Sequence, residues 1–224
     1  MSSPSDRPKS HNTTNVVYIP GQSITEWLAP YGVQLADVQI AQVQKYISIL
    51  ALWNQKISLT SIENPQEIVA RHFGESFFGA KFVENTRCRL ADVGSGAGFP
   101  GLALKIVLAE LRVSLIEQDT RKATFLNEVI RALNMDAAKV YRSSYESLAP
   151  EIAEFDVIVA RAVGDHKSLL NWAGPRLSAT GKVILWLGTE DATRLSHLSD
   201  WKWDLPRPLP ESKNRVLLSG TIEK

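Results

Sequence analysis

The residues of this chain with the clearest chemical potential form a glycine-rich loop. Residues 92–101 read DVGSGAGFPG and follow a short apolar run at residues 89–93. Glycine lets the backbone turn tightly and approach a ligand where a Cβ atom would clash, and Pro100 suits the first turn of a following helix. The sequence therefore predicts a ligand-binding loop, with Gly94, Gly96 and Gly98, at a strand-to-helix junction.

Two kinds of cofactor fit this loop. Read as Gly96-x-Gly98-x-x-Gly101, it matches the dinucleotide pattern in which a helix N-terminus receives a pyrophosphate. Read from Asp92 as DxGxGxG, it is the acidic loop of Rossmann-like methyltransferases. An acidic side chain suits the ammonium and sulfonium groups of S-adenosylmethionine, whereas it would repel a pyrophosphate. Asp92 therefore favours the methyl donor.

Polar residues that follow later apolar runs complete the candidate cofactor site. Glu117 ends the run after the loop, at the position where either cofactor needs a carboxylate for its ribose hydroxyls. Ligands of parallel α/β sheets bind at the carboxyl ends of the strands. Tyr145 and Glu146 are therefore expected near the adenine, and Arg161 is expected to face the methyl group.

A particular order of strands and helices must position these residues. Apolar residues between positions 35 and 54 recur at helical spacing, and Asn64-Pro65 predicts the start of a helix that runs towards Phe82. From Leu90 onward, short apolar runs alternate with amphipathic stretches, the segment 145–152 among them. This alternation predicts a Rossmann-like α/β fold with a mostly parallel, seven-stranded sheet. Residues 201–205 and 215–219 predict a terminal antiparallel hairpin.

The chain is predicted to have three parts. Residues 1–20 are polar and form a flexible tail, residues 21–85 form an N-terminal helical extension, and residues 86–224 form the methyltransferase domain.

Composition narrows the class of protein. The 224 residues carry a net charge of +1 and one cysteine, which excludes an internal disulfide and a cysteine-based zinc site; no metal is expected. The sequence starts without the apolar run of a secretory signal and contains no stretch long enough to span a bilayer. A cytoplasmic protein without membrane contact is therefore expected.

The motifs together resemble the ribosomal RNA small-subunit methyltransferase G family, also called glucose-inhibited division protein B. The resemblance runs from about Ala51 to the C-terminus. It rests on Asn54, Ser58-Leu59-Thr60, Arg71-His72, Ser76, the glycine loop with its Phe-Pro-Gly ending, Arg121-Lys122, Phe125-Leu126 and Val159-Ala160-Arg161-Ala162. Two positions depart from the pattern: Glu75 replaces a frequent aspartate and keeps its charge, and Leu187 replaces a frequent lysine.

The resemblance implies a class I methyltransferase fold, S-adenosylmethionine as cofactor, and methylation of guanine N7 in the 530 loop of 16S rRNA. The family's cofactor contacts would fall on Gly94, Phe99, Tyr145, Glu146 and Arg161. Guanine N7 carries a lone pair and no proton at neutral pH, so the reaction needs no general base. Catalysis can then rest on alignment of the reactants and on electrostatic stabilisation.

Three residues are the catalytic candidates. Arg161 is predicted to anchor the site and to position the target guanine, by donating to O6 or to a nearby phosphate. Arg71 and His72 are predicted to reach the site from the helical extension and to touch RNA or the cofactor. The alternative interpretation makes His72 an ordinary core or helix-surface histidine.

The near-neutral charge predicts that the enzyme recognises a large, shaped substrate. RNA affinity is expected from dispersed cations, namely Arg71, Lys105, Arg121, Lys122, Arg161 and Arg207. The expected partner is 16S rRNA in the small ribosomal subunit or its precursor, bound by a monomer, with weak methylation of short oligonucleotides. Most of the six tryptophans are assigned to the core.

Three other functions stay open at this point. The first is an NAD-dependent oxidoreductase on a Rossmann fold, which Asp92 opposes. The second is a class I methyltransferase that acts on a small molecule or a protein, against which only the family resemblance argues. The third is a non-catalytic RNA-binding module, which the intact glycine loop with Asp92 and Glu117 opposes.

Overall fold

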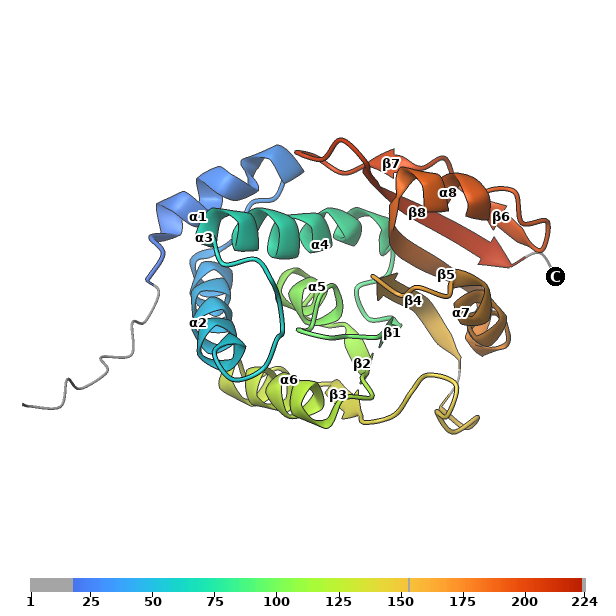
Figure 1. The fold of residues 1–224 in the computed structure, drawn as a ribbon, viewed down its shortest axis with the longest axis horizontal. Helices are drawn as coiled ribbons and strands as arrows, with labels where there is room; N and C mark the ends of the chain where they lie inside the picture. The colour runs from blue at the N-terminus through green and yellow to red at the C-terminus, as the bar shows by residue number, and fades with distance from the viewer. Residues whose placement is uncertain (1–17, 153, 223–224) are drawn as a thin grey trace, which may run out of the picture.

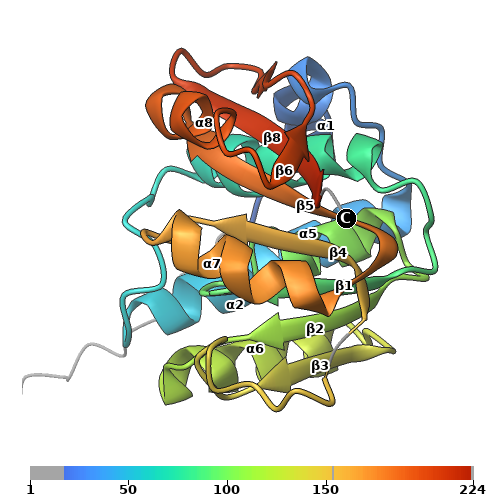
Figure 2. The same cartoon turned by 90° about the vertical axis from the view of Figure 1, so that its right-hand side faces the viewer.

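A twisted sheet forms the centre of the computed structural model, which describes residues 18–152 and 154–222 (Figures 1 and 2). Its strands are β1 (Arg89–Val93), β2 (Arg112–Ile116), β3 (Ala138–Tyr141), β4 (Phe155–Arg161), β5 (Leu177–Gly188), β6 (Trp201–Trp203), β7 (Arg207–Pro208) and β8 (Arg215–Ile222). Seven strands follow the order β3-β2-β1-β4-β5-β8-β6, and β7 pairs with β8. Strands β1 to β5 pair in parallel, whereas β8 runs antiparallel to β5, β6 and β7. The predicted Rossmann-like sheet with a terminal antiparallel pair is confirmed, with the two-residue β7 as an addition.

The helices lie on both faces of the sheet (Figure 2). They are α1 (Gly21–Leu28), α2 (Asp37–Asn54), α3 (Pro65–Glu67), α4 (Glu75–Phe78), α5 (Gly101–Val107), α6 (Thr120–Ala132), α7 (His166–Ala173) and α8 (Thr189–Leu195). Short 3-10 turns occupy Ala29–Tyr31, Gly79–Phe82 and Gly174–Arg176. Helix α2 contacts both α5 and α6, so these helices form one layer.

Side chains of the buried strands alternate between two hydrophobic clusters, one on each face of the sheet. In β4, Val157 and Val159 belong to the cluster of α2, α5 and α6, whereas Ile158 and Ala160 belong to the cluster of α7 and α8. Successive residues of a strand point to opposite faces, so a sheet covered on both faces needs apolar residues at nearly every position. This is why β4 reads as an unbroken apolar run in the sequence.

The N-terminal helices share a core with the sheet. Their buried residues belong to the same hydrophobic cluster as those of α5 and α6, and Gln39 donates to the carbonyl of Ile106 in α5 (2.9 Å). The division between the extension (21–85) and the methyltransferase domain (86–224) therefore stays a prediction. Of the predicted tail, residues 1–17 lie outside the described residues, and Ile19 is buried.

The helix predicted to start at Asn64-Pro65 is present but is not α-helical throughout. The Asn64 side chain accepts from the Glu67 backbone N–H (3.1 Å), and Pro65 occupies the first turn. A π-helix then spans Ile68–Gly74 and leads directly into α4. π-Helical turns are rare and are frequently found at functional sites, and this one carries Arg71 and His72.

The amphipathic stretch at residues 145–152 forms no helix, so that part of the predicted alternation is wrong. The segment consists of turns, with Leu148 buried against the sheet. Pro150 disfavours the helical conformation of the residue before it, and so short a segment gains little from helix formation. The segment instead places Tyr145 and Glu146 beside the carboxyl ends of the strands.

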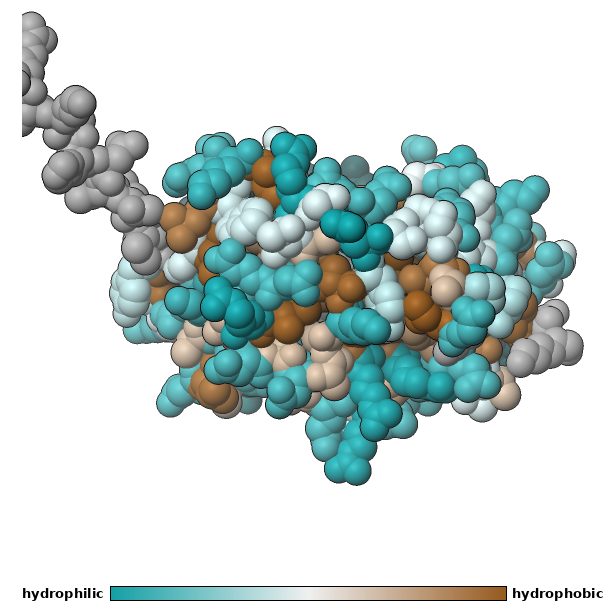
Figure 3. Space-filling model, turned by 90° about the horizontal axis from the view of Figure 1, so that it is seen from below, coloured by the Kyte–Doolittle hydropathy of each residue, from teal (hydrophilic) through white to brown (hydrophobic). Residues whose placement is uncertain are grey.

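The surface at the side of α6 and β3 is largely hydrophilic. Hydrophobic side chains form only small groups on the face seen in Figure 3. Among the described residues, no helix combines the length and the apolar character that crossing a bilayer requires.

Candidate active site

A cavity of about 480 Å³ opens at the carboxyl ends of β1, β2 and β4. The predicted site residues that line it are His72, Gly94, Gly96, Phe99, Glu117, Tyr145, Glu146 and Arg161. Neighbouring walls come from Leu59, Val93, Ile116, Lys122 and Val163, among others. The structure thus gathers most of the predicted cofactor residues around one hollow, although they come from separate parts of the chain.

The glycine loop turns sharply over this cavity and is tied to Glu117. Gly94 and Gly96 have φ angles of 68° and 53°, a left-handed conformation that residues with a Cβ atom rarely adopt. The Gly96 N–H donates to Oε2 of Glu117 (2.8 Å), and Oε1 accepts from the Asp119 N–H (2.8 Å). These two bonds fix the carboxylate at the cavity wall, where it can still accept from the hydroxyls of a ribose.

Tyr46, from α2, supports the loop from below. Its hydroxyl donates to the carbonyl of Ala97 (2.7 Å), and its ring stacks on Phe99 with centroids 5.3 Å apart. Gly98 does not line the cavity; it packs on Tyr46, Leu102 and Leu126. Burial raises the pKa of Tyr46 well above its usual value, so the hydroxyl remains a hydrogen-bond donor.

Replacing Tyr46 with phenylalanine is expected to lower the free energy of unfolding by about 1 kcal/mol, because the Ala97 carbonyl loses its partner. Affinity for S-adenosylmethionine should fall a few-fold, since the loop is held less rigidly. Urea denaturation and calorimetric titration measure the two effects. The matched control is Tyr18→Phe, at a side chain that is 77% exposed. Equal stability of the two variants would contradict the supporting role of Tyr46.

Asp92 does not line the cavity and instead caps the start of α5. It is fully buried, and its Oδ2 accepts from the Gly101 N–H (2.9 Å). Oδ1 has no hydrogen-bond partner within the described residues. Burial raises the pKa of Asp92 to about 7, while the bond from Gly101 opposes that rise. The expectation that this acid faces the cationic part of the cofactor therefore finds no support in its position.

The raised pKa predicts a pH-dependent difference between the wild type and Asp92→Asn. Asp92 titrates near 7 when folded but at about 3.9 when unfolded, so the folded state holds the proton more tightly. The wild type should lose a few kcal/mol of stability relative to the variant as the pH rises from about 4 to about 7. Urea denaturation at several pH values tests this. A difference that is independent of pH would contradict it.

His72 packs its ring flat against Phe99 and hydrogen-bonds with Thr60. The two rings lie 4.8 Å apart at 14°, and Nε2 lies 2.8 Å from the Thr60 hydroxyl oxygen. Burial, assisted by the positive charges of Arg161 and Arg71, lowers the pKa of His72 to about 3. The ring is therefore neutral at physiological pH. The ring lines the cavity and packs on Phe99, and its contact with RNA or the cofactor stays a prediction.

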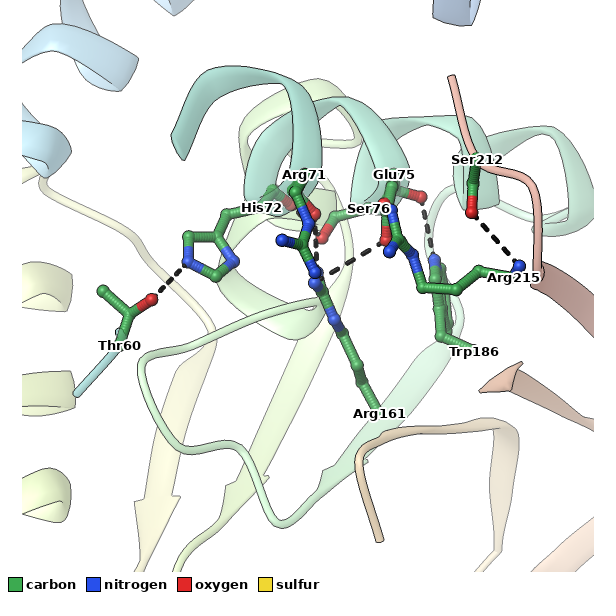
Figure 4. Close-up of polar contacts among 9 residues, drawn as sticks. All are labelled: Thr60, Arg71, His72, Glu75, Ser76, Arg161, Trp186, Ser212 and Arg215. Carbon is green, nitrogen blue, oxygen red and sulfur yellow. Dashed lines mark hydrogen bonds and ion pairs between the residues drawn. The ribbon is translucent and has the colours of Figure 1, made fainter. Parts of the chain in front are cut away.

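Arg161 is held by a network around the buried carboxylate of Glu75 (Figure 4). Its Nη1 donates to the carbonyl of Arg71 (2.8 Å), and its Nη2 lies 3.6 Å from Oε2 of Glu75. Arg215, from β8, donates to the other oxygen, Oε1, through Nε (3.1 Å) and Nη2 (2.5 Å). Trp186 donates to the Glu75 carbonyl (2.8 Å). The guanidinium of Arg161 is thus fixed at the edge of the cavity.

Two further predicted residues lie away from the cavity. The Arg71 side chain does not line the cavity; it borders a separate hollow with Tyr31 and Arg215, and its carbonyl is what meets Arg161. Lys105 was expected among the RNA-binding cations, and the structure contradicts this. It is buried and donates to the carbonyls of Ala109 and Leu111 (2.7 Å each). Carbonyl groups near the end of a helix lack intrahelical partners, and the Lys105 ammonium group satisfies two that lie just beyond α5.

The chemistry of the cavity fits S-adenosylmethionine better than a dinucleotide. Glu117 suits a ribose, the wall at Ile116 is apolar, and Arg161 suits the carboxylate of an amino acid. A dinucleotide would place its pyrophosphate on the N–H groups at the start of α5. There the Asp92 carboxyl already accepts from Gly101, which opposes the oxidoreductase alternative.

Two supporting residues were missed by sequence reasoning. Tyr46 lies 51 positions from Ala97, and Arg215 lies 140 positions from Glu75. No local pattern marks either contact. A tyrosine on the apolar face of α2 was a possible signal, since a buried hydroxyl needs a partner.

Residues 39–201 match the family described as rRNA small subunit methyltransferase G. The match spans well over half of the chain. The chain belongs to this family. The resemblance seen in the sequence is confirmed, and with it the prediction of an S-adenosylmethionine-dependent rRNA methyltransferase.

Individual members of the methyltransferase G family are similar over most of their length. The protein of that name from Acetivibrio thermocellus is 38% identical over 168 residues, which cover 74% of this chain and 69% of the relative. The protein from an Exiguobacterium strain is 30% identical over 203 residues, which cover 89% of this chain and 79% of the relative. The family match at residues 39–201 therefore includes most of α2, the π-helix and strands β1 to β5.

Solved methyltransferase structures share the fold of this family member. A ribosomal protein L11 methylase from Lactobacillus delbrueckii has a TM-score of 0.60 at 16% identity, with 73% of this chain and 81% of that chain covered. A glycopeptide N-methyltransferase in complex with sinefungin has a TM-score of 0.57 at 12% identity, with 68% and 87% covered. At such identities the likeness concerns the fold alone, and it confirms the class I methyltransferase fold.

Proposed function

We propose that this chain transfers the methyl group of S-adenosylmethionine to N7 of a guanine in the 530 loop of 16S rRNA. The observation that carries the proposal is the cavity where Gly96, Glu117 and Arg161 meet, in a member of the rRNA small subunit methyltransferase G family. Cofactor contacts are assigned to the lining residues Gly94, Gly96, Phe99, Glu117, Tyr145, Glu146 and Arg161. Asp92 and Gly98 are assigned a supporting role on the side of the loop that faces away from the cavity, without contact to the cofactor.

The bound cofactor supplies a methyl group that its sulfonium activates for displacement. The protein's own residues then align the reactants. Glu117 holds the ribose side, and Arg161 holds the amino-acid end or the target nucleotide. His72 stays neutral because burial lowers its pKa to about 3, so it adds no positive charge beside a sulfonium. No residue has to remove a proton, since guanine N7 carries none.

Replacing Arg161 with alanine is expected to lower kcat/KM for methylation about 10- to 100-fold. Without the guanidinium a reactant is held less accurately, and a small displacement of a reactant reduces the rate by about this factor. The guanidinium is largely buried and is fixed by Arg71 and Glu75, so its loss also removes a defined contact. The control is Arg87→Ala, at a side chain that is 76% exposed and pairs with Glu110. Wild-type activity of Arg161→Ala would contradict the assigned role.

The proposed partner is 16S rRNA in the small ribosomal subunit or its precursor, bound by a monomer in the cytoplasm. A net charge of +1 gives little general attraction for phosphates. Lys105 is buried and contributes no contact to a phosphate, which reduces that attraction further. Efficient recognition is therefore expected to need the shape of an assembled subunit, and an isolated stem-loop should be methylated weakly.

The proposal is tested with purified protein, tritiated S-adenosylmethionine and small subunits that lack the mark. After digestion to nucleosides, the label is expected in 7-methylguanosine, and a naked stem-loop should acquire far less of it. Calorimetry with S-adenosylmethionine and with NAD provides a second readout. Label in another nucleoside, or binding of NAD in place of S-adenosylmethionine, would contradict the proposal.

A further inference from the structure

A second hollow, of about 300 Å³, adjoins the proposed cofactor cavity. Its lining includes Ala162 and Val163 after β4, Trp186 and Gly188 of β5, and Asp191 of α8. Ala162 and Val163 also line the cofactor cavity, so the two hollows share a wall at the end of β4. A group seated in the second hollow would therefore lie next to whatever occupies the first.

The order of the strands fixes which way this hollow faces. The sheet runs β1-β4-β5, with the glycine loop at the end of β1 and the start of α8 directly after β5. The cofactor cavity thus lies on the β1 side of the β4 end, and α8 lies on the opposite side. Asp191, in the first turn of α8, lines the second hollow on the side opposite the wall that it shares with the cofactor cavity.

We propose that Asp191 reads the Watson–Crick edge of the target guanine and selects this base for methylation. The inference rests on the proposed function, because it assumes that guanine N7 meets the methyl group at the shared wall. N7 lies on the major-groove edge of guanine, whereas the N2 amino group lies on the minor-groove edge, with N1 beside it. The N1–H and N2–H donors are thus across the six-membered ring from N7, and with N7 at Ala162 and Val163 they are placed on the side of α8 and Asp191.

The state of the Asp191 side chain suits this role. Oδ1 forms an ion pair with the guanidinium of Arg194, and the side chain is one-third exposed. No hydrogen bond among the described residues uses Oδ2, so it can accept from a ligand. Among the residues that line this hollow, Asp191 alone carries a carboxylate. Its neighbour Glu190 does not line this hollow; it borders an adjacent one, which Asp191 borders as well.

A carboxylate at this position distinguishes guanine from the other purine. Guanine presents two N–H donors on this edge, and a carboxylate accepts from both. At the positions of these two donors, adenine presents the N1 lone pair and C2–H, so neither position would donate to the Asp191 oxygens. A site built to hydrogen-bond a substrate discriminates strongly against an analogue that lacks the group.

The test compares small subunits reconstituted with guanine or with inosine at the target position. Inosine keeps N7 and N1–H but lacks the N2 amino group, so it removes one of the two contacts. The wild type is expected to methylate the guanine subunit about tenfold faster, in kcat/KM, than the inosine subunit. In Asp191→Ala, methylation of guanine should fall at least tenfold, and the preference for guanine over inosine should disappear.

Glu190→Ala is the matched control, because it removes an adjacent carboxylate from the same turn, and it should keep the wild-type preference. Melting temperature and calorimetric affinity for S-adenosylmethionine verify that each variant is folded and binds its cofactor. A guanine preference that persists in Asp191→Ala, with the wild type active, overturns the inference alone. A wild type that leaves the guanine subunit unmethylated overturns the proposed function, and the inference with it.

Discussion

Replacing Glu75 with alanine is expected to lower the free energy of unfolding by about 3–5 kcal/mol. The Glu75 side chain is 1% exposed, and it compensates the guanidinium groups of Arg161 and Arg215. Without it, both cations lose their partner, and Arg161 remains buried. Burial already lowers the pKa of Arg161, while the charge of Glu75 opposes that fall. Urea denaturation measures the change in stability.

The same substitution is expected to reduce methylation about tenfold, even at temperatures where the variant is folded. Arg161 would keep its bond to the Arg71 carbonyl but lose the charge that orients its other nitrogen. The control is Glu84→Ala, which removes a carboxylate that is 83% exposed and paired with Lys182; exposed ion pairs contribute little. If Glu75→Ala were as stable and as active as Glu84→Ala, the network would have no part in holding Arg161.

Replacing Gly98 with alanine is expected to cost about 2–5 kcal/mol of stability and to abolish binding of S-adenosylmethionine. The φ angle of Gly98 is 82°, which costs an L-residue about 1–2 kcal/mol. A Cβ atom there would also overlap the Tyr46 hydroxyl and crowd Leu102 and Leu126, and overpacking costs about 1–3 kcal/mol. Relief of these clashes would displace the loop that borders the cofactor cavity.

Two further variants separate the clash from the backbone strain. Gly96 has a φ of 53°, but a Cβ atom there would meet no atom closer than 3.8 Å, so Gly96→Ala should lose only the backbone contribution of about 1–2 kcal/mol. Removal of the Tyr46 hydroxyl in Gly98→Ala/Tyr46→Phe should restore part of the lost stability. Thermal melts and calorimetric titration compare all three. Equal destabilisation by Gly96→Ala and Gly98→Ala would contradict the assigned role of Tyr46.

Most of the sheet was predictable because its signal is local. Strand β1 was expected at residues 89–93 and lies at Arg89–Val93, since a strand buried on both faces reads as an apolar run. The segment 145–152 was predicted as an amphipathic stretch of the alternation, but it has too few residues before Pro150 to form a helix. Periodicity alone could not separate a short amphipathic helix from a buried turn, because a buried turn also needs apolar anchors such as Leu148.

The candidate site was predictable where its residues lie in one loop or at strand ends. Gly94, Gly96 and Glu117 follow from that rule and line the cavity as a group. The direction in which a side chain points could not be predicted by this rule. Asp92 was recognised as an acid before the loop, but whether it faces a ligand or the start of α5 depends on the packing of α5 on β1. The Glu75–Arg215 contact joins α4 to β8, and such a pairing leaves no local trace in a single sequence.

The most direct test maps the methylated nucleotide at single-base resolution. Small subunits that lack the 530-loop mark are incubated with the protein and S-adenosylmethionine, and the extracted 16S rRNA is treated with borohydride and aniline, which cleave the chain at 7-methylguanosine. The proposed function predicts one new cleavage site, at a guanine of the 530 loop, that requires both protein and cofactor and is weakened in Arg161→Ala. Cleavage elsewhere, or none despite bound S-adenosylmethionine, would contradict it.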